Sequence, residues 1–304
     1  MFNWLGGNKD GSDAPGTQNQ HNAVIRVVGD RSAGKTTYMA ALARWPNANP
    51  SSPVQAITPI NEDGRRLIDK AQLLLEDGLE IEPDRLQQVD DLLDYSLQIV
   101  LKDQFSWAKV RGDHALVTLN LSCKDYSGEF FRDILASTAD PTLDDYIDDC
   151  QQADGLLLLV DGTNRRRDEV CTRGLNRLFM ALDQVDLVGS TQRRVALVLT
   201  KCEQPELWVK RLEPKTLAAQ RFPQLYQRLQ SWQQTGSGQV DVFTNSAFGM
   251  LGQQYPQPNA KRATRTADGV KWVLQTPRLW RPFGMVAPIY WLCTGKRHPA
   301  LEDD

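Results

Sequence analysis

The chain has 304 residues, with 35 basic and 38 acidic side chains and a formal net charge of −3. Hydrophobic residues make up 41% of it and charged residues 24%, which is typical of a soluble globular protein rather than a disordered one. A charge balance so near neutral argues against a nucleic-acid-binding surface or a polybasic membrane surface. No apolar run approaches the roughly 20 residues of a membrane helix, so we expect no integral membrane segment.

The cysteines predict a reducing, cytoplasmic location. They are odd in number, widely scattered and without a Cys-x-x-Cys pair, at Cys123, Cys150, Cys171, Cys202 and Cys293. This pattern excludes a disulfide scaffold and a standard zinc site. The N-terminus has neither the cationic start nor the sustained apolar stretch of a secretory signal.

Residues 1–22 contain almost nothing that could enter a core, so we expect a flexible N-terminal tail. One domain is then expected over 23–304. A β-branched run at 24–28 predicts a strand that ends in glycine, and 36–44 predicts a helix. Strand, glycine-rich turn and helix follow one another without a gap.

Residues 46–94 predict a helical insertion. Within it, apolar side chains recur at helical spacing between Leu67 and Leu75, and Asn61 precedes them as a candidate N-cap. A second helical pattern begins near Pro83. We therefore expect helices between the first strand–helix unit and the next strands.

Two extended segments follow the insertion, at 95–105 and 114–123, with a turn around Gly112 between them. The second segment alternates apolar leucines with smaller or polar residues, which is typical of a strand. We expect the two to pair as antiparallel strands and to place an antiparallel strand at the edge of a larger sheet.

Continuous apolar runs at 155–162 and 194–201 are typical of parallel strands that are covered on both faces. Helical patterns lie at 175–185 and 225–232, and a further strand is expected at 239–246. Strands that alternate with helices predict an α/β fold with a doubly wound, mostly parallel sheet.

A phosphate-loop motif, G-x-x-x-x-G-K-[ST], lies between the first predicted strand and helix. Its residues are Gly29, Asp30, Arg31, Ser32, Ala33, Gly34, Lys35 and Thr36, with Thr37 next. The glycines let backbone amides turn inward around a phosphate, and the helix N-terminus adds a partial positive charge. We expect Lys35 to bridge the β- and γ-phosphates and the Thr36 hydroxyl to bind Mg²⁺. The motif predicts a P-loop NTPase fold; a plain exposed glycine turn is the weaker alternative.

A second motif directly follows the segment 114–123. At the carboxyl end of that strand, Asp125 is placed to hold a water on Mg²⁺, and the Gly128 amide is placed to sense the γ-phosphate. The pattern D-x-x-G is common, and its alternative is an ordinary turn. Its place after a phosphate loop favours the functional interpretation.

Two further motifs end later strands: Thr200, Lys201, Cys202 and Glu203 end one, and Asn245, Ser246 and Ala247 end the next. Over roughly 23–250, the ordered set of motifs resembles the Ras-like GTPases of the translation-factor (TRAFAC) class. The resemblance implies a guanine nucleotide held by Thr200, Lys201 and Glu203, with the Ser246–Ala247 backbone on the guanine oxygen. A carboxylate suits guanine because the ring presents two adjacent N–H donors. Glu203 stands where the family usually has aspartate.

The helical insertion occupies the family's first-switch region, and the segment 252–304 is atypical of a minimal member. Its apolar run at 285–293 is compatible with a short helix or a strand. The long insertion, the Asp-x-x-Gly-Glu motif and the late Pro-Ile-Tyr-Trp-Leu run also resemble the bacterial double-GTPase group.

Two departures from the family pattern bear on hydrolysis. Glu129 stands where the family usually has a glutamine that orients the attacking water, and 78–102 contains no threonine to close over Mg²⁺. Arg31 is expected either near the γ-phosphate, where it would stabilise transition-state charge, or away from it, facing solvent or in an ion pair with Glu129 or Asp30. The basic run 165–167 is interpreted as a solvated helix start.

Together these features predict a guanine-nucleotide switch that hydrolyses GTP slowly to GDP with Mg²⁺, through Lys35, Arg31, Gly128 and Glu129. An effector or regulatory protein is the expected partner. The alternative is an interaction protein that holds GTP with little or no hydrolysis. An ATP-using phosphoryl transferase is a third hypothesis, against which Glu203 and the Ser246–Ala247 pair count.

Overall fold

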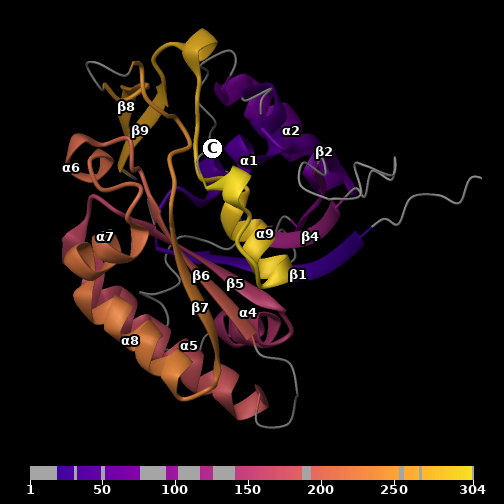
Figure 1. The fold of residues 1–304 in the computed structure, drawn as a ribbon, viewed down its shortest axis with the longest axis vertical. Coiled ribbons are helices and arrows are strands. Elements are labelled where there is room, and N and C mark those ends of the chain that lie inside the picture. The colour runs from indigo at the N-terminus through magenta and orange to yellow at the C-terminus, as the bar shows by residue number, and fades with distance from the viewer. Residues whose placement is uncertain are drawn as a thin grey trace, which may run out of the picture.

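The computed structural model describes residues 19–30, 33–48, 52–75, 94–101, 117–125, 141–186, 193–252, 257–266 and 269–302. The strands are β1 (Asn19–Gly29), β2 (Val54–Pro59), β3 (Asp94–Leu101), β4 (Val117–Asp125), β5 (Gly155–Asp161), β6 (Arg193–Thr200), β7 (Gly238–Thr244), β8 (Ala260–Thr266) and β9 (Gly269–Leu274). Seven of them form one sheet in the order β2-β3-β4-β1-β5-β6-β7, and β8 and β9 form a separate hairpin (Figure 1).

The helices are α1 (Lys35–Ala48), α2 (Glu62–Leu75), α4 (Pro141–Gln151), α5 (Asp168–Asp186), α6 (Pro205–Trp208), α7 (Pro214–Arg221), α8 (Pro223–Gln234) and α9 (Ala287–Thr294). Short 3₁₀ turns are η3 (Arg165–Arg167), η4 (Pro277–Leu279) and η5 (Pro299–Leu301). Over the part of the chain described, none of the helices combines the length and apolar character of a membrane span.

The sheet confirms the predicted α/β class with a mostly parallel arrangement. β1, β4, β5, β6 and β7 run parallel to their neighbours in this group, and β3 runs antiparallel to both β2 and β4. β2 was not predicted, because it is a short and mostly incompletely buried segment that ends in Pro59. An edge strand tolerates such residues, since one side of it has no ladder to complete. The insertion at 46–94 therefore contains a strand as well as helix α2; the second predicted helix near Pro83 lies outside the described residues.

β1 begins earlier than expected. Residues 19–22, which were predicted to belong to the tail, pair in parallel with the start of β4, with Asn19 opposite Val117. Their polar side chains find partners at the exposed end of the sheet, as where Asn120 donates to Asn22 over 2.8 Å. Residues 19–22 therefore belong to β1 because they pair with β4, although their polar composition is typical of a tail.

Helices cover both faces of the sheet (Figure 1). Along β5, Leu157 and Leu159 pack into the cluster that contains α1, α2 and α9, whereas Leu156 and Leu158 pack into the cluster that contains α4, α5 and α8. Because successive side chains of a strand point to opposite faces, a strand covered twice is apolar throughout. This explains the continuous apolar run of β5.

The connections that leave the carboxyl ends of the neighbouring strands β1 and β5 go to opposite faces of the sheet. β1 leads into α1, on one face of the sheet, and β5 leads through η3 into α5, on the other face. In open α/β sheets, the crevice at such a division is where ligands bind. The fold therefore directs attention to the residues that follow β1, β5, β6 and β7.

The predicted cap Asn61 ties α2 to the sheet. Its Oδ1 accepts hydrogen bonds from the amides of Gly64, at 2.8 Å, and Ser96, at 3.1 Å. Its Nδ2 donates to the Asp94 carbonyl at 2.6 Å. One side chain therefore caps the helix and fastens it to the start of β3, which confirms the sequence-based assignment of the cap.

We expect Asn61→Ala to lower the free energy of unfolding by about 2 kcal/mol, because it removes an N-cap and two further hydrogen bonds. Urea unfolding measures the change. Asp69→Ala, at an exposed position of the same helix, is the control and should change stability by less than about 0.5 kcal/mol. Equal effects of the two substitutions would contradict this role for Asn61.

Candidate nucleotide site

The predicted phosphate loop joins β1 to α1, and its backbone requires glycine at both ends. A Cβ on Gly29 would lie 2.5 Å from the carbonyl oxygen of Leu159. Gly34 has a φ of +83°, in the left-handed region that favours glycine. Between them the Ala33 amide donates to the Asp30 carbonyl over 3.1 Å, which closes a tight turn.

Lys35 places a cation at the N-terminus of α1. Its side chain folds back so that Nζ donates to the Gly29 carbonyl at 3.0 Å, and the residue is only 8% exposed. A cation at this end of a helix opposes the helix dipole. An anion bound by the loop would offset this unfavourable interaction, since it interacts favourably with both the ammonium and the positive end of the helix dipole. Thr36 and Thr37 follow in the first turn, and Thr36 is exposed.

Thr200, at the end of β6, connects the phosphate loop to the other half of the site. Its buried hydroxyl lies 2.8 Å from the Ala33 carbonyl and 3.2 Å from the Val160 carbonyl, as a donor. The loop after β1 is therefore held from β6, two strands away in the sheet.

The next residue, Lys201, is fixed by Asp161 at the end of β5. The Lys201 Nζ lies 2.6 Å from Asp161 Oδ2, and Asp161 Oδ1 accepts from the amide and hydroxyl of Thr163. Lys201 has a φ of +62°, a left-handed conformation otherwise found only at glycines in the described part of the chain. Sequence reasoning missed Asp161. Asp161 lies opposite Thr200 in the paired strands β5 and β6, a relation that only the folded sheet shows.

Glu203 is buried with half of its carboxylate unpaired. The residue is 3% exposed, and Ser246, the residue's own backbone and Gln204 interact with the carboxylate in ways that lower its pKa. Among the residues that the structure describes, none donates a hydrogen bond to Oε2. Burial raises the pKa of Glu203, and the hydrogen bond from Ser246 only partly opposes this effect. A buried acceptor without a donor is destabilising, so this oxygen marks a place for a ligand that carries N–H groups.

The turn after β7 completes this end of the site. The carbonyl of Asn245 accepts from the Cys202 amide at 3.0 Å, which ties this turn to the one after β6. The Ser246 amide donates to the Phe283 carbonyl at 3.1 Å and is therefore engaged. This leaves the Ala247 amide as the candidate donor to a ligand.

Several predicted residues cannot be placed in this geometry. Arg31, Ser32, Gly128 and Glu129 lie outside the described residues. Asp125 is described by its backbone, which ends β4 in register with Val27 of β1. Across the described ranges, no group of three or more His, Cys, Asp or Glu side chains is placed to hold a metal ion. The roles of these residues in hydrolysis and metal binding stay predictions.

One arginine of the predicted solvated run reaches the phosphate loop. The run forms η3, and its first two members, Arg165 and Arg166, are exposed as expected. Arg167, however, places Nε 3.0 Å from Asp30 Oδ2. Sequence reasoning missed this ion pair, because nothing local to either residue relates the end of β5 to the loop after β1.

Comparisons with known proteins add little. No family model matches the chain, and no curated protein matches it significantly. A similar solved structure is the ADP-ribosylation-factor-like GTP-binding protein (small COPII coat GTPase SAR1) of Encephalitozoon cuniculi in complex with GDP, at 13% identity and a TM-score of 0.31, covering 74% of this chain and 69% of that one. Another is the signal recognition particle receptor SRb-GTP/SRX complex of Chaetomium thermophilum, at 12% identity and a TM-score of 0.39, covering 76% and 92%. Similarity at this level carries no functional argument, so function must be argued from the site.

The raised pKa of Glu203 predicts how pH affects the ligand-free protein. A carboxyl whose pKa is higher in the folded than in the unfolded state contributes stability below its unfolded pKa, and that contribution is lost as pH rises through its folded pKa. Glu203→Gln keeps the neutral form at every pH. We expect this variant to raise the melting temperature of ligand-free protein by about 2–4 °C at pH 8, and by less near pH 5.

Thermal unfolding followed by circular dichroism measures this difference. Glu213→Gln, at an exposed position, is the control and should leave the melting temperature unchanged at both pH values. A Glu203→Gln variant that is no more stable than wild type at pH 8 would contradict an unpaired buried carboxylate.

Proposed function

We propose that this protein is a Mg²⁺-dependent GTPase of the Ras-like, TRAFAC type that hydrolyses GTP slowly and acts as a cytoplasmic switch. The observation that carries the proposal is the unpaired, buried Oε2 of Glu203 at the same edge of the sheet as the phosphate loop. An effector or regulatory protein would recognise the nucleotide-dependent state. The Asp-x-x-Gly-Glu motif and the insertion after α1 support placement near the bacterial double-GTPase group.

Guanine suits the Glu203 carboxylate better than adenine does. Guanine offers two adjacent N–H donors to a carboxylate, whereas adenine offers a single amino group next to an acceptor nitrogen. A charge-assisted pair of hydrogen bonds would satisfy the oxygen that is otherwise unpaired. Lys201, held by Asp161, would place its aliphatic stem beside the base, and the Ala247 amide would donate to the guanine oxygen.

The phosphates would lie on the loop after β1. Its amides, the Lys35 ammonium and the N-terminus of α1 all favour negative charge at the same point. Thr200 ties this loop to β6, so the phosphate and base contacts belong to one packed unit.

Mg²⁺ fits the oxygen donors that the sequence places here. Thr36 is exposed at the start of α1, and Asp125 ends the strand that neighbours β1. These two residues would hold the ion, which would supply neutralisation of the phosphate charge. Lys35 and the Gly128 amide would stabilise the γ-phosphate, Arg31 would add positive charge, and Glu129 would orient water less well than glutamine does.

Nucleotide binding tests the proposal directly. We expect wild-type protein to bind fluorescent GDP and to be displaced by GTP at far lower concentrations than by ATP. Lys35→Ala should weaken GDP binding at least about 100-fold, because a cation near two phosphates is lost. Glu203→Gln should reduce the preference for GTP over ATP by about tenfold or more, because an amide nitrogen then faces the guanine donors.

The exposed Lys296 offers a matched control, since Lys296→Ala also removes one ammonium and should bind GDP like wild type. Equal competition by ATP and GTP in wild type would favour the ATP-using phosphoryl transferase. Unchanged GDP affinity in folded Lys35→Ala protein would remove the phosphate-loop assignment.

Hydrolysis is the second test. In single-turnover assays with Mg²⁺ we expect slow conversion of GTP to GDP, because the phosphate loop is present while the glutamine is replaced. Arg31→Ala should lower the rate about tenfold with GTP affinity little changed, if the arginine acts on the transition state. Glu129→Gln should raise the rate, because it removes a negative charge beside the γ-phosphate.

A rate that Arg31→Ala does not change would identify this arginine as a surface charge. A lower rate in Glu129→Gln would identify Glu129 as a working base. GTP that stays intact on wild-type protein at high protein and Mg²⁺ concentration would favour a protein that only holds GTP.

A further inference from the structure

The C-terminal part of the chain returns to the base end of the proposed site. After β7, the chain leaves the sheet, forms the β8–β9 hairpin and comes back before α9, which packs on the sheet (Figure 1). We call residues 245–249 the base turn and residues 280–286 the brace. The β8–β9 hairpin separates the two segments in sequence, yet their backbones lie side by side.

Hydrogen bonds from the brace reach three successive residues of the base turn. Ser246 and Phe283 exchange two backbone hydrogen bonds, at 3.1 and 3.0 Å. The Trp280 indole donates from Nε1 to the Ala247 carbonyl at 2.8 Å. The Asn245 side-chain amide donates to the sulfur of Met285 at 3.0 Å. The base turn is therefore held by the brace along its length.

Two glycines allow this close approach. Gly249, with a φ of +73°, would place a Cβ 1.9 Å from the Arg281 carbonyl oxygen. Gly284, with a φ of +66°, would place one 2.0 Å from the Thr244 carbonyl oxygen. Any side chain at either position would push the two backbones apart. The contact therefore depends on glycine once on each side.

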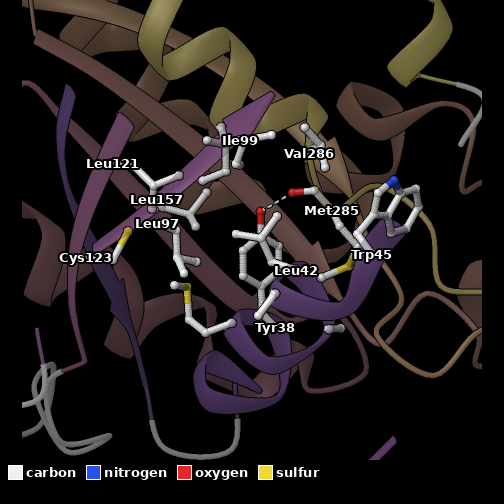
Figure 2. Close-up of a cluster of buried hydrophobic side chains, with 14 of the residues drawn as sticks. Tyr38, Leu42, Trp45, Leu97, Ile99, Leu121, Cys123, Leu157, Met285 and Val286 are labelled. Atoms are coloured by element: carbon white, nitrogen blue, oxygen red, sulfur yellow. Dashed lines mark hydrogen bonds between the residues drawn. The ribbon is translucent and has the colours of Figure 1, made fainter. Parts of the chain in front are cut away.

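Met285 also connects the brace to the helix that follows the phosphate loop. Its carbonyl accepts a hydrogen bond from the Tyr38 hydroxyl at 2.5 Å, inside the apolar cluster with Trp45 and Val286 (Figure 2). Burial raises the pKa of Tyr38, so the phenol stays protonated and donates. One brace residue thus contacts both α1 and the base turn.

We propose that the brace sets the position of the Ala247 amide, and with it the affinity for the oxygen at position 6 of guanine. This inference rests on the proposed guanine-nucleotide function and assigns Trp280, Met285 and Gly284 as positioning residues. The physical reason is that a backbone amide, unlike a side-chain donor, cannot rotate by itself toward its acceptor. Its direction is set by the peptides on either side, and the brace holds the carbonyls of both Ser246 and Ala247.

A nucleotide altered at position 6 tests the inference. In 6-thio-GDP, sulfur replaces the oxygen and accepts hydrogen bonds weakly, so the affinity ratio of GDP to 6-thio-GDP reports on this contact. Trp280→Phe keeps an aromatic ring at this buried position but removes the indole donor, together with the volume of the five-membered ring. We expect the ratio to fall at least about threefold in this variant, with the melting temperature of the ligand-free protein within a few degrees of wild type.

Trp272→Phe is the matched control, because Trp272 is 43% exposed on β9 and the chemical change is the same. Its ratio should equal that of wild type. If the Trp280→Phe ratio also equals that of wild type, or if the variant loses GDP and 6-thio-GDP binding equally, the brace does not position the amide and the inference fails.

A second pair of variants separates close contact from backbone strain. Gly284→Ala and Gly236→Ala both place alanine at a left-handed φ, but a Cβ on Gly236 would meet nothing within 4 Å. We expect GDP to dissociate about tenfold faster from Gly284→Ala and at the wild-type rate from Gly236→Ala. Equal dissociation rates would contradict the inference. If Gly284→Ala does not fold, the Trp280→Phe ratio decides.

The wild-type protein separates failure of this inference from failure of the proposed function. Wild-type protein that does not bind GDP would overturn both. Wild-type protein that binds GDP and shows the same affinity ratio as Trp280→Phe would overturn the brace alone.

Discussion

Burial of the Glu203 carboxylate with one oxygen unpaired is the constraint around which the turns after β6 and β7 are organised. A buried carboxylate that lacks a donor is unfavourable, so such a group tends to take up a proton or to bind water. Here Cys202 and Asn245 join the adjacent turns through the backbone, and Ser246 interacts with the carboxylate and lowers its pKa. The surrounding backbone is thus arranged to keep an unfavourable acceptor in place. This is typical of sites at which a ligand supplies the missing donors.

The sheet makes this arrangement possible because parallel strands bring their carboxyl ends to one edge. The loop after β1, Asp161 at the end of β5, Lys201 after β6 and Ser246 after β7 come from distant parts of the chain. Strands covered by helices on both faces are rigid, so their ends are fixed relative to one another. Thr200 then links the loop after β1 to the end of β6 by a hydrogen bond to the Ala33 carbonyl.

Features that depend on neighbouring residues were predictable, and features that depend on distant ones were not. The phosphate loop, the buried strands β5 and β6 and the Asn61 cap are each encoded within about ten residues. β2 was missed because an edge strand lacks the apolar pattern of a central strand. The start of β1 was missed because β4 orders it from outside.

Within the candidate site the same division holds. Contiguous motifs led to the prediction of Lys35 and Glu203 as site residues, but no pattern indicated that Glu203 would carry an unpaired oxygen, since this depends on packing. The ion pair of Arg167 with Asp30 and the return of the chain at Phe283 each join segments that are far apart in sequence. Only the folded chain brings them together.

The position of the brace in the chain has a consequence for biosynthesis. A nascent chain exposes the loop after β1 before the brace, because this loop precedes the brace in the sequence. Phe283 and Met285, whose contacts hold the turn after β7, are made only after all the strands of the seven-stranded sheet. Since a domain generally folds as a unit, the turn after β7 can gain its full set of contacts only once the brace has been made. Until then, the backbone of this turn lacks the partners that Phe283 and Trp280 supply in the folded chain.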